Sequence, residues 1–563
     1  MKRKRAQFQE IEPDEIFLDS SNLPSFDTDQ FEGRIERPIE RHSYLVLGAF
    51  FVVCALVFAG KTYALQVVAG DEYRTRSENN RLSHELIFAD RGILEDRTGE
   101  ELAFNRREEG LPYARRVYAA RGGLAHVLGY AKQPAKDRAG FYYQDRYIGI
   151  DGAEKSYDAA LSGENGLKIT ETDALGAVVS ESVITPARHG ERITLSIDAA
   201  VQERLYQEIK HRVEESGFRG GAGVVMDVES GELLALTNFP EYDPTLLSNG
   251  EDAGAIKRLL EGEGTPFLNR ASAGLFTPGS IMKPFVAIEA LRRKVIDPRT
   301  QILSTGSISV QNPYNPERET VFSDWKAHGL VDMRRALAVS SNVYFFEVGG
   351  GYREQRGIGI EGIAQAFRNF GFGAPTNVGV FPEQDGIIPT PRWKEEVFPD
   401  DPWRIGDTYN TAIGQYSTQV TPLQAVRAAA ALANGGTLIT PILRAGERGL
   451  SDYVPLDAED LAVVREGMRQ AVLEGTASAL NIGGVAVAAK TGTAELDSRK
   501  SYVNSWVIGY FPYDAPRYAF AVLLERGPYK NLYGAAGVAG AFMLWLRDNA
   551  REYTESATPN ETL

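Results

Sequence analysis

An uncharged apolar run near the start of the chain limits its fold more than any other feature. Residues Ser43–Gly60 read SYLVLGAFFVVCALVFAG, eighteen positions without a charge, and apolar residues resume after Lys61. About 20 apolar residues let a helix cross a bilayer, and a lysine at its end can extend to the headgroups. We therefore predict one transmembrane helix over residues 43–65. A buried core helix is the alternative, and a cleaved signal peptide does not fit a run that begins this late.

Basic residues are unevenly placed around this run. Seven Lys or Arg residues precede it, and only three occupy the twenty positions after Gly60. The positive-inside rule then places the N-terminus in the cytoplasm and everything after about residue 65 outside the membrane. Residues 1–42 are polar and lack hydrophobic periodicity. We expect them to form a cytoplasmic arm that is either disordered or bound to a partner.

The composition excludes several classes of protein. The chain has 563 residues and is 43% hydrophobic, enough to build two or three domains rather than a disordered chain. Its net charge of -15 would repel nucleic-acid phosphates, so no nucleic-acid partner is expected. The single cysteine, Cys54, lies in the predicted span, which excludes a disulfide framework and a thiolate-rich metal site.

Two regions follow the span. Residues 66–193 are turn-rich with short strand-like runs and predict an elongated α+β pedestal, in which ITETDALGAVVSESVI indicates two strands joined through Gly176. Residues 194–550 predict one α+β domain in which helices cover a five-stranded antiparallel sheet, with an amphipathic helix over residues 199–216 and a last helix around Val538 to Leu546. Residues 551–563 are expected to be a flexible tail. Two of the five strands are expected in GAGVVMDVESGELLALTNF, and one in each of the later runs VAVAAKTGTA, VNSWVIGYF and YAFAVLLER.

The first motif with groups that could do chemistry is PGSIMKP, residues 278–284. Ser280 follows a Pro-Gly turn and begins a helix, and Lys283 lies one turn later on the same face. This pairs a possible nucleophile with a possible base, and the backbone N–H of Ser280 can serve as an oxyanion donor. As a lone match, the pattern is more often an N-cap serine with a surface lysine.

Two further motifs follow. Ser340–Asn342 (SSN) lies at the end of the helical run MRRALAVSSNVYFFEV and offers a hydroxyl and an amide two residues apart, although such triplets often cap helices. Lys490–Thr493 (KTGT) follows an apolar run that predicts a strand, and its lysine and hydroxyls suit carboxylate recognition. Both threonine hydroxyls are expected on one face of that strand. Gly492 is expected to let a substrate backbone approach closely.

In this order, and about 60 and 150 residues apart, the three motifs form the set of penicillin-recognising serine enzymes. The chain resembles the class B penicillin-binding proteins, peptidoglycan DD-transpeptidases, from the membrane span to the final helix. RGILEDRTGEELAFN and GIDGAEKSYDAALSGENG are similar to the family's pedestal motifs, and GDTYNTAIGQYSTQVTPLQ is similar to a later landmark. The stretch FSDWKAHGLVDMRRAL and the run Trp403–Gln415 make the chain most like the elongation-type branch, penicillin-binding protein 2.

The resemblance implies a role for each motif residue. Ser280 would be the catalytic nucleophile and Lys283 its base, kept neutral by burial and by the nearby charge of Lys490. Ser340 would pass a proton to the leaving amine, and Asn342 would orient the substrate amide and the base. Thr491 and Thr493 would bind the terminal carboxylate of a D-Ala-D-Ala stem, and Gly492 would let the substrate backbone approach. The N–H groups of Ser280 and Thr493 would form the oxyanion hole.

The resemblance also implies function and partners. A dimerisation-type pedestal over 66–193 and a transpeptidase domain over 194–550 would cross-link stem peptides in cell-wall synthesis that maintains cell shape. The acyl-enzyme at Ser280 would be trapped by penicillins, and no cofactor is needed. A polytopic membrane glycosyltransferase of the SEDS family is the implied protein partner.

A metal is not predicted. Some elongation-type members carry a cysteine near the second motif that helps hold a metal, whereas this chain has Asp324, His328 and Asp332 there without a cysteine. An aspartate and a histidine near a loop are more often a surface hydrogen-bonded pair, which is the interpretation we adopt.

Two other functions share part of the pattern. A membrane-anchored serine β-lactamase has the same three motifs, but a class A enzyme also needs E-x-x-L-N before the third motif, and none follows Asn342. A non-catalytic scaffold that activates a partner polymerase would not need intact motifs, and penicillin labelling distinguishes it. A bifunctional enzyme is disfavoured because the pedestal contains no E-D-x-x-F.

Overall fold

The computed structural model describes residues 41–172, 177–250, 252–262, 264–312, 315–530 and 534–555. The chain divides into two units, Met1–Ser83 with Thr170–Glu181 and His84–Ile169 with Ser182–Leu563, and each is described separately. The predicted cytoplasmic arm before residue 41 lies outside the described residues. So do Gly176 and residues 556–563 of the predicted tail. Residues 551–555 of that tail are not a loose end: Arg551–Tyr553 form a 3-10 turn, and the buried Tyr553 hydroxyl donates to Asp198 at 2.6 Å.

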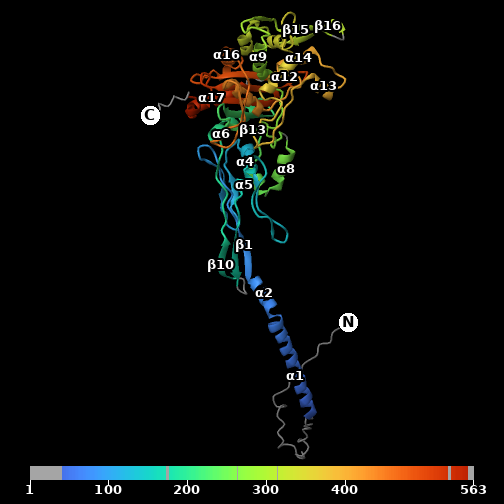
Figure 1. Ribbon diagram of the computed structural model, residues 1–563, viewed down its shortest axis with the longest axis vertical. Helices are drawn as coiled ribbons and strands as arrows, with labels where there is room; N and C mark the ends of the chain where they lie inside the picture. Colours follow the sequence, from blue (N-terminus) through green and yellow to red (C-terminus); the bar gives the residue numbers. More distant parts are fainter. Residues whose placement is uncertain are drawn as a thin grey trace, which may run out of the picture. The chain divides into compact units, whose positions relative to one another are not determined.

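The first unit begins with the predicted membrane helix (Figure 1). Helix α1 (Arg41–Tyr63) continues through a π-helical turn (Ala64–Val68) and is followed by the polar α2 (Gly70–Arg81). The stretch Arg41–Val68 reaches a mean hydropathy of 2.3 with no residue of that part buried, so it is long and apolar enough to cross a membrane. Three strands pair in the order β1-β9-β10. They are β1 (Leu82–Ile87), β9 (Gly166–Thr172) and β10 (Val178–Thr185).

The pedestal part of the second unit is built from short strands and helices. Its main sheet has the order β11-β2-β3-β4, in which β11 runs parallel to β2. The elements are β2 (Leu94–Glu95), β3 (Glu101–Arg106), β4 (Arg115–Tyr118), α3 (Ala125–Leu128), β5 (Ala131–Lys132), β6 (Ala135–Lys136), β7 (Tyr142–Gln144), β8 (Ile148–Gly149), α4 (Gly152–Ser156), α5 (Asp158–Leu161) and β11 (Ile193–Thr194).

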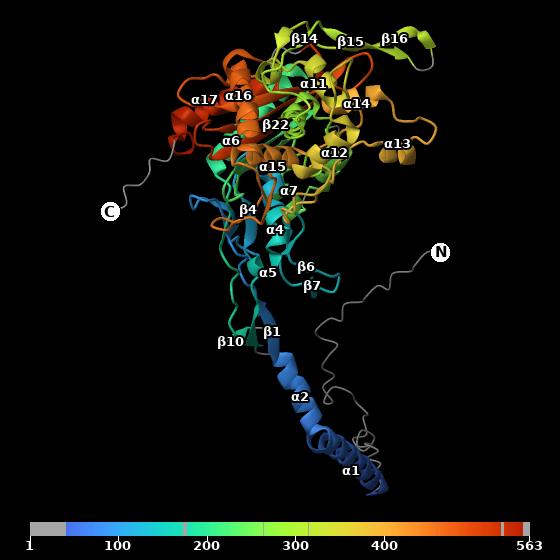
Figure 2. The ribbon, with the colours of Figure 1, turned by 45° about the horizontal axis from the view of Figure 1, so that its top comes forward.

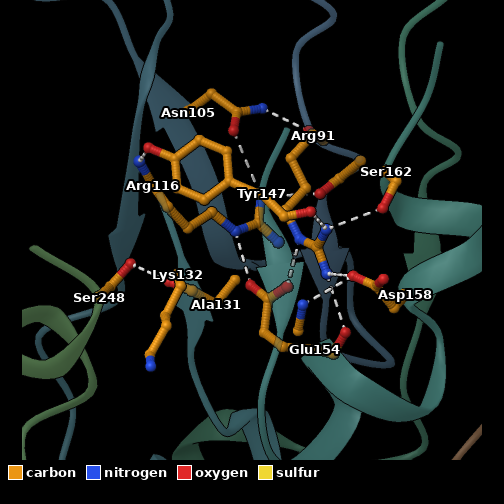
Figure 3. Close-up of polar contacts among 12 residues, drawn as sticks. Arg91, Asn105, Arg116, Ala131, Lys132, Tyr147, Glu154, Asp158, Ser162 and Ser248 are labelled. Atoms are coloured by element: carbon orange, nitrogen blue, oxygen red, sulfur yellow. Dashed lines mark hydrogen bonds and ion pairs between the residues drawn. The ribbon is translucent and has the colours of Figure 1, made fainter. Parts of the chain in front are cut away.

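A buried network of charges holds this region together (Figure 3). Glu154 of α4 is fully buried and pairs with Arg91 at 2.5 Å and with Arg116 at 2.7 Å. Arg91 also donates to Asp158 at 2.7 Å. Burial disfavours the charge on Glu154, but the two guanidinium groups outweigh it, so the pKa of Glu154 is lowered. Arg91 and Glu154 come from the two stretches that are similar to the family's pedestal motifs, and this network is the structural reason for those residues.

The larger part of the second unit is the predicted α+β domain. Its five-stranded antiparallel sheet has the order β13-β12-β22-β21-β20, so β20 is an edge strand. The stretch GAGVVMDVESGELLALTNF supplies two of the strands and the three later predicted runs supply the others, so the predicted fold class is confirmed. The strands are β12 (Gly220–Asp227), β13 (Leu233–Phe239), β20 (Ala488–Glu495), β21 (Tyr502–Phe511) and β22 (Tyr518–Pro528).

Helices cover both faces of this sheet (Figure 2). Helices α6 (Ala199–Ser216) and α17 (Ala535–Asn549) pack on one face, and α15 (Pro422–Ala433) packs on the other. Side chains of a strand alternate between its faces. Accordingly, Val225 of β12 belongs to the core with α6 and α17, whereas Val224 belongs to the core with α15. The helix predicted over 199–216 has the same bounds as α6. The observed last helix, α17, extends beyond the predicted Val538 to Leu546 at both ends.

Further helices and small two-stranded sheets complete the domain. They are α7 (Pro244–Asn249), α8 (Ala253–Glu261), a 3-10 turn (Gly279–Met282), α9 (Lys283–Arg292), β14 (Ile302–Ser304), β15 (Ser307–Asn312), β16 (Asn315–Ser323), β17 (Gly329–Val331), α10 (Met333–Ala338), α11 (Asn342–Gly350), α12 (Gly359–Asn369), α13 (Pro391–Val397), α14 (Ile405–Ala412), β18 (Thr437–Ile439), β19 (Ser451–Tyr453) and α16 (Ala458–Glu474).

Candidate active site

Ser280 stands on the 3-10 turn that leads into α9, next to edge strand β20. The turn and the strand are in close contact. A Cβ atom on Gly492 of β20 would lie 2.6 Å from the carbonyl oxygen of Pro278, and one on Gly279 would lie 2.9 Å from that of Thr493. From the sequence, we expected Gly492 to leave room for a substrate backbone. In the structure, the chain segment that carries Ser280 occupies it, which is a different physical reason for the glycine.

The second motif interrupts what the sequence suggested was one helical run. Helix α10 ends at Ala338, and α11 begins at Asn342. Between them Ser340 has a φ of 59°, in the left-handed region that non-glycine residues rarely adopt. Ser341 then caps α11 by accepting a hydrogen bond from the backbone N–H of Tyr344. The break turns the side chains of Ser340 and Asn342 toward α9.

The hydroxyl of Ser340 lies between two buried lysines. Lys490 Nζ donates to Ser340 Oγ at 2.8 Å, and Lys283 Nζ lies 3.4 Å from the same oxygen. Lys283 Nζ also donates to the carbonyl oxygen of Ser340 at 2.8 Å and to Asn342 Oδ1 at 2.7 Å. Both lysines are fully buried. Residues from three distant motifs therefore meet at one point.

Burial changes the protonation of both lysines. It lowers the pKa of Lys283 to about 7, although the carboxylate of Asp324 acts in the opposite direction. Burial first, and the charge of Lys283 second, lower the pKa of Lys490 well below its ordinary value. From the sequence, we expected the charge of Lys490 to contribute to the neutrality of Lys283. In the structure, burial is the leading cause.

The remaining predicted residues line the same place. Ser280 is half-buried, and its hydroxyl makes no hydrogen bond within the described part of the chain. Thr493 is exposed on β20, where its hydroxyl can reach a ligand. Thr491 Oγ1 donates to Thr476 Oγ1 at 2.6 Å. The sequence analysis missed Thr476, which lies 15 residues before Thr491 and belongs to no motif.

The pair Asp324 and His328 differs from its interpretation as a surface pair. The two side chains are only 0% and 2% exposed, with 3.6 Å between His328 Nε2 and Asp324 Oδ1. The third residue considered with them, Asp332, instead caps α10 by accepting the N–H of Arg335. Among the residues that the structure describes, no group of three or more His, Cys, Asp or Glu side chains could hold a metal ion.

Comparisons with known proteins decide the family. The family described as "Penicillin binding protein transpeptidase domain" matches residues 221–544, more than half of the chain. The family described as "Penicillin-binding Protein dimerisation domain" matches residues 109–195. The chain belongs to the penicillin-binding protein transpeptidase family. A relative in this family, the peptidoglycan D,D-transpeptidase MrdA of Salmonella typhimurium, is 30% identical over 76% of this chain and 71% of its own length.

Two solved structures are similar to this chain. The complex between penicillin-binding protein 2 and MreC from Helicobacter pylori matches with a TM-score of 0.68 and 26% identity, over 83% of this chain and 99% of that one. A structure of a peptidoglycan synthase complex that coordinates polymerization and crosslinking matches with a TM-score of 0.69 and 25% identity, over 92% and 99%. The predicted class B, elongation-type membership is confirmed. The residue roles and the predicted domain boundaries stay predictions.

Proposed function

We propose that this chain is a serine-type peptidoglycan D,D-transpeptidase that cross-links stem peptides through an acyl-enzyme at Ser280 and is inhibited by penicillins. The observation that carries the proposal is the Ser340 hydroxyl, which contacts both Lys283 and Lys490 beside the turn of Ser280. Its relatives are named for the same activity. No cofactor is part of the proposal.

Acylation follows from the position of Lys283. A lysine with a pKa of about 7 is substantially neutral at physiological pH and can accept the hydroxyl proton when Ser280 turns toward it. Ser280 Oγ bonds to the carbonyl carbon of the penultimate D-Ala, and the oxyanion receives the N–H groups of Ser280 and Thr493. The C–N bond then breaks. The leaving D-Ala amine takes the proton from Lys283 through Ser340.

Edge strand β20 is suited to bind the donor. An edge strand leaves backbone N–H and C=O groups unpaired, so an extended peptide can align along it. Lys490 and the hydroxyls of Thr491 and Thr493 would bind the terminal carboxylate. An amine from a second stem peptide then attacks the carbonyl carbon of the acyl-enzyme and gives its proton to Lys283. The C–O bond to Ser280 breaks, and Lys283 returns that proton to the departing Ser280 oxygen.

Labelling with a fluorescent penicillin tests this function. The purified full chain should form one covalent adduct, and peptide mapping should place it on Ser280. The Ser280→Ala variant is the control and should not label. Absence of labelling in a folded wild-type protein would leave a non-catalytic scaffold as the remaining function.

Membrane placement and partners extend the proposal. The protein is membrane-anchored, and we infer a cytoplasmic N-terminus with the catalytic domain on the periplasmic side of the inner membrane. Protease added outside spheroplasts should digest the part after about residue 65 and spare a tag at Met1. Because the related structures include a peptidoglycan synthase complex, we infer a SEDS-family glycosyltransferase as partner. Co-purification from membranes tests it.

A further inference from the structure

One buried carboxylate outside the three motifs ties the Ser340 turn to the rest of the domain. Asp324 directly follows β16, and its side chain is 0% exposed. Helix α11 contacts both β14 and β16, and Figure 2 shows these elements together at one end of the domain. Asp324 lies where these elements meet.

The carboxylate of Asp324 binds three donors through a single oxygen. Oδ2 accepts from the hydroxyl of Ser341 at 2.8 Å, from the backbone N–H of Val343 at 3.0 Å and from the hydroxyl of Ser304 at 3.3 Å. The Val343 N–H is one of the donors that the first turn of α11 leaves without a partner inside the helix. A negative charge at that end also interacts favourably with the positive N-terminal end of the helix dipole. Asp324 therefore fixes the start of α11 and joins it to the end of β14.

The bonds to Asp324 hold other residues of the turn than those that contact Lys283. Ser340 and Asn342 direct their polar atoms to Lys283, while Ser341 between them directs its hydroxyl to Asp324. The left-handed backbone of Ser340 is intrinsically unfavourable and persists only when surrounding contacts hold it. Lys283 supplies the contacts to Ser340 and Asn342, and Asp324 supplies those to Ser341 and Val343.

We propose that Asp324 is a positioning residue of the transpeptidase reaction, whose bonds to Ser341 and Val343 hold Ser340 and Asn342 against Lys283. The proposal rests on the proposed function above. Among the described residues, Asp324 makes no hydrogen bond with Ser280 or Lys283; it acts on the reaction through the turn and through its charge.

The charge of Asp324 gives the proposal a signature that a purely structural residue lacks. The titratable groups that face Lys283 are Asp324, Lys490 and His328, and Lys326 in turn faces His328. Asp324 favours the ammonium form of Lys283, so removing its charge lowers the pKa of Lys283 further. Lys283 then stays neutral to lower pH, so the acid limb of the acylation rate against pH shifts to lower pH.

The test compares three variants of the full chain by stopped-flow acylation with a fluorescent penicillin from pH 5.5 to 9. Asp324→Asn should acylate at least about fivefold more slowly at pH 8, with its acid limb about half a pH unit lower or more. Ser341→Ala removes the hydrogen bond to Asp324 together with the contact to Ser304 and the cap of α11, but keeps the charge of Asp324. It should therefore slow acylation about threefold or more and leave the limb in place. Asp332→Asn changes the cap at the first turn of α10, where Asp332 accepts the N–H of Arg335 and not a donor from Ser340, Ser341 or Asn342, and it should match the wild type.

Each outcome bears on the proposal. Wild-type rates and limbs in both Asp324→Asn and Ser341→Ala would overturn it, while labelling of Ser280 in the same samples would leave the proposed function intact. A slower Asp324→Asn with an unmoved limb would also overturn it, because general loosening lowers a rate without changing the base. If Asp324→Asn does not fold, the rate and limb of Ser341→Ala alone decide.

Discussion

Replacing Lys283 by arginine tests the chemistry of the site most directly. Lys283 is fully buried, and burial lowers its pKa from 10.5 to about 7. At pH 7.4 roughly 70% of a group with that pKa is neutral, against about one in 1,000 for an ordinary lysine. The protein thus raises the population of the free base several hundredfold. That gain is what the substitution removes.

Arginine keeps the charge but is effectively never deprotonated in a protein. General base catalysis contributes about 10²- to 10⁴-fold, so penicillin acylation by Lys283→Arg should slow by at least about 100-fold at pH 7.4. The wild-type rate should fall about tenfold per pH unit below pH 7, whereas the variant should show no such limb. Stopped-flow measurement of acylation against pH records both quantities.

The control is a second buried lysine. Lys394 in α13 is 2% exposed and donates to Asp407 at 2.7 Å, and no motif includes it. Lys394→Arg therefore measures what an arginine costs at a buried lysine, and it should acylate at the wild-type rate. If folded Lys283→Arg also acylates near the wild-type rate, Lys283 is not the base, and Ser340 or a water molecule becomes the candidate.

Four further substitutions should separate binding, electrostatics and stability. Thr493→Val and Thr491→Val each remove a hydroxyl proposed to bind the substrate carboxylate and should slow acylation about tenfold, since a hydrogen bond to a charged group contributes about 1.5–3 kcal/mol; wild-type rates in both would contradict that role. Lys490→Ala should leave the acid limb of the second-order acylation constant, which reports the free enzyme, at the same pH. It should move the acid limb of the limiting acylation rate at saturating penicillin, which reports the complex, to higher pH. Both constants come from the same stopped-flow series. Glu154→Gln should destabilise the second unit by about 3–5 kcal/mol in urea denaturation, because it leaves two buried guanidinium groups without their counter-charge; a loss below about 1 kcal/mol would refute this.

Much of the fold was predictable because its signals are local. The i, i+4 stripe of Val201, Leu205, Ile209 and Val213 predicts a helix with one apolar face, and all four side chains are buried in α6. The five strands were recognised from apolar runs bounded by turn residues. A pattern of this kind depends on neighbours in the sequence, and such neighbours also decide the local structure.

The break at Ser340 was not predictable, because its cause lies elsewhere in the sequence. Nothing in Ser-Ser-Asn forbids a continuous helix. The turn is held by Lys283, 57 residues earlier, and by Asp324, which is 17 residues before Ser341. The hydrogen bond from Thr491 to Thr476 is hidden for the same reason. Motif spacing identified which residues belong to the site, but only the fold shows what holds them.

The two lysines account for the site better as a pair than singly. Lys490 Nζ and Lys283 Nζ lie 2.8 and 3.4 Å from the same Ser340 oxygen, so two ammonium charges there oppose each other strongly in a buried setting. In the free protein, burial and Lys283 therefore disfavour the charge on Lys490. A substrate carboxylate bound beside Lys490 would restore that charge, and the restored ammonium would in turn favour neutral Lys283. Binding would then help to prepare the base, so loss of Lys490 should shift the pH limb of the complex and spare the limb of the free enzyme.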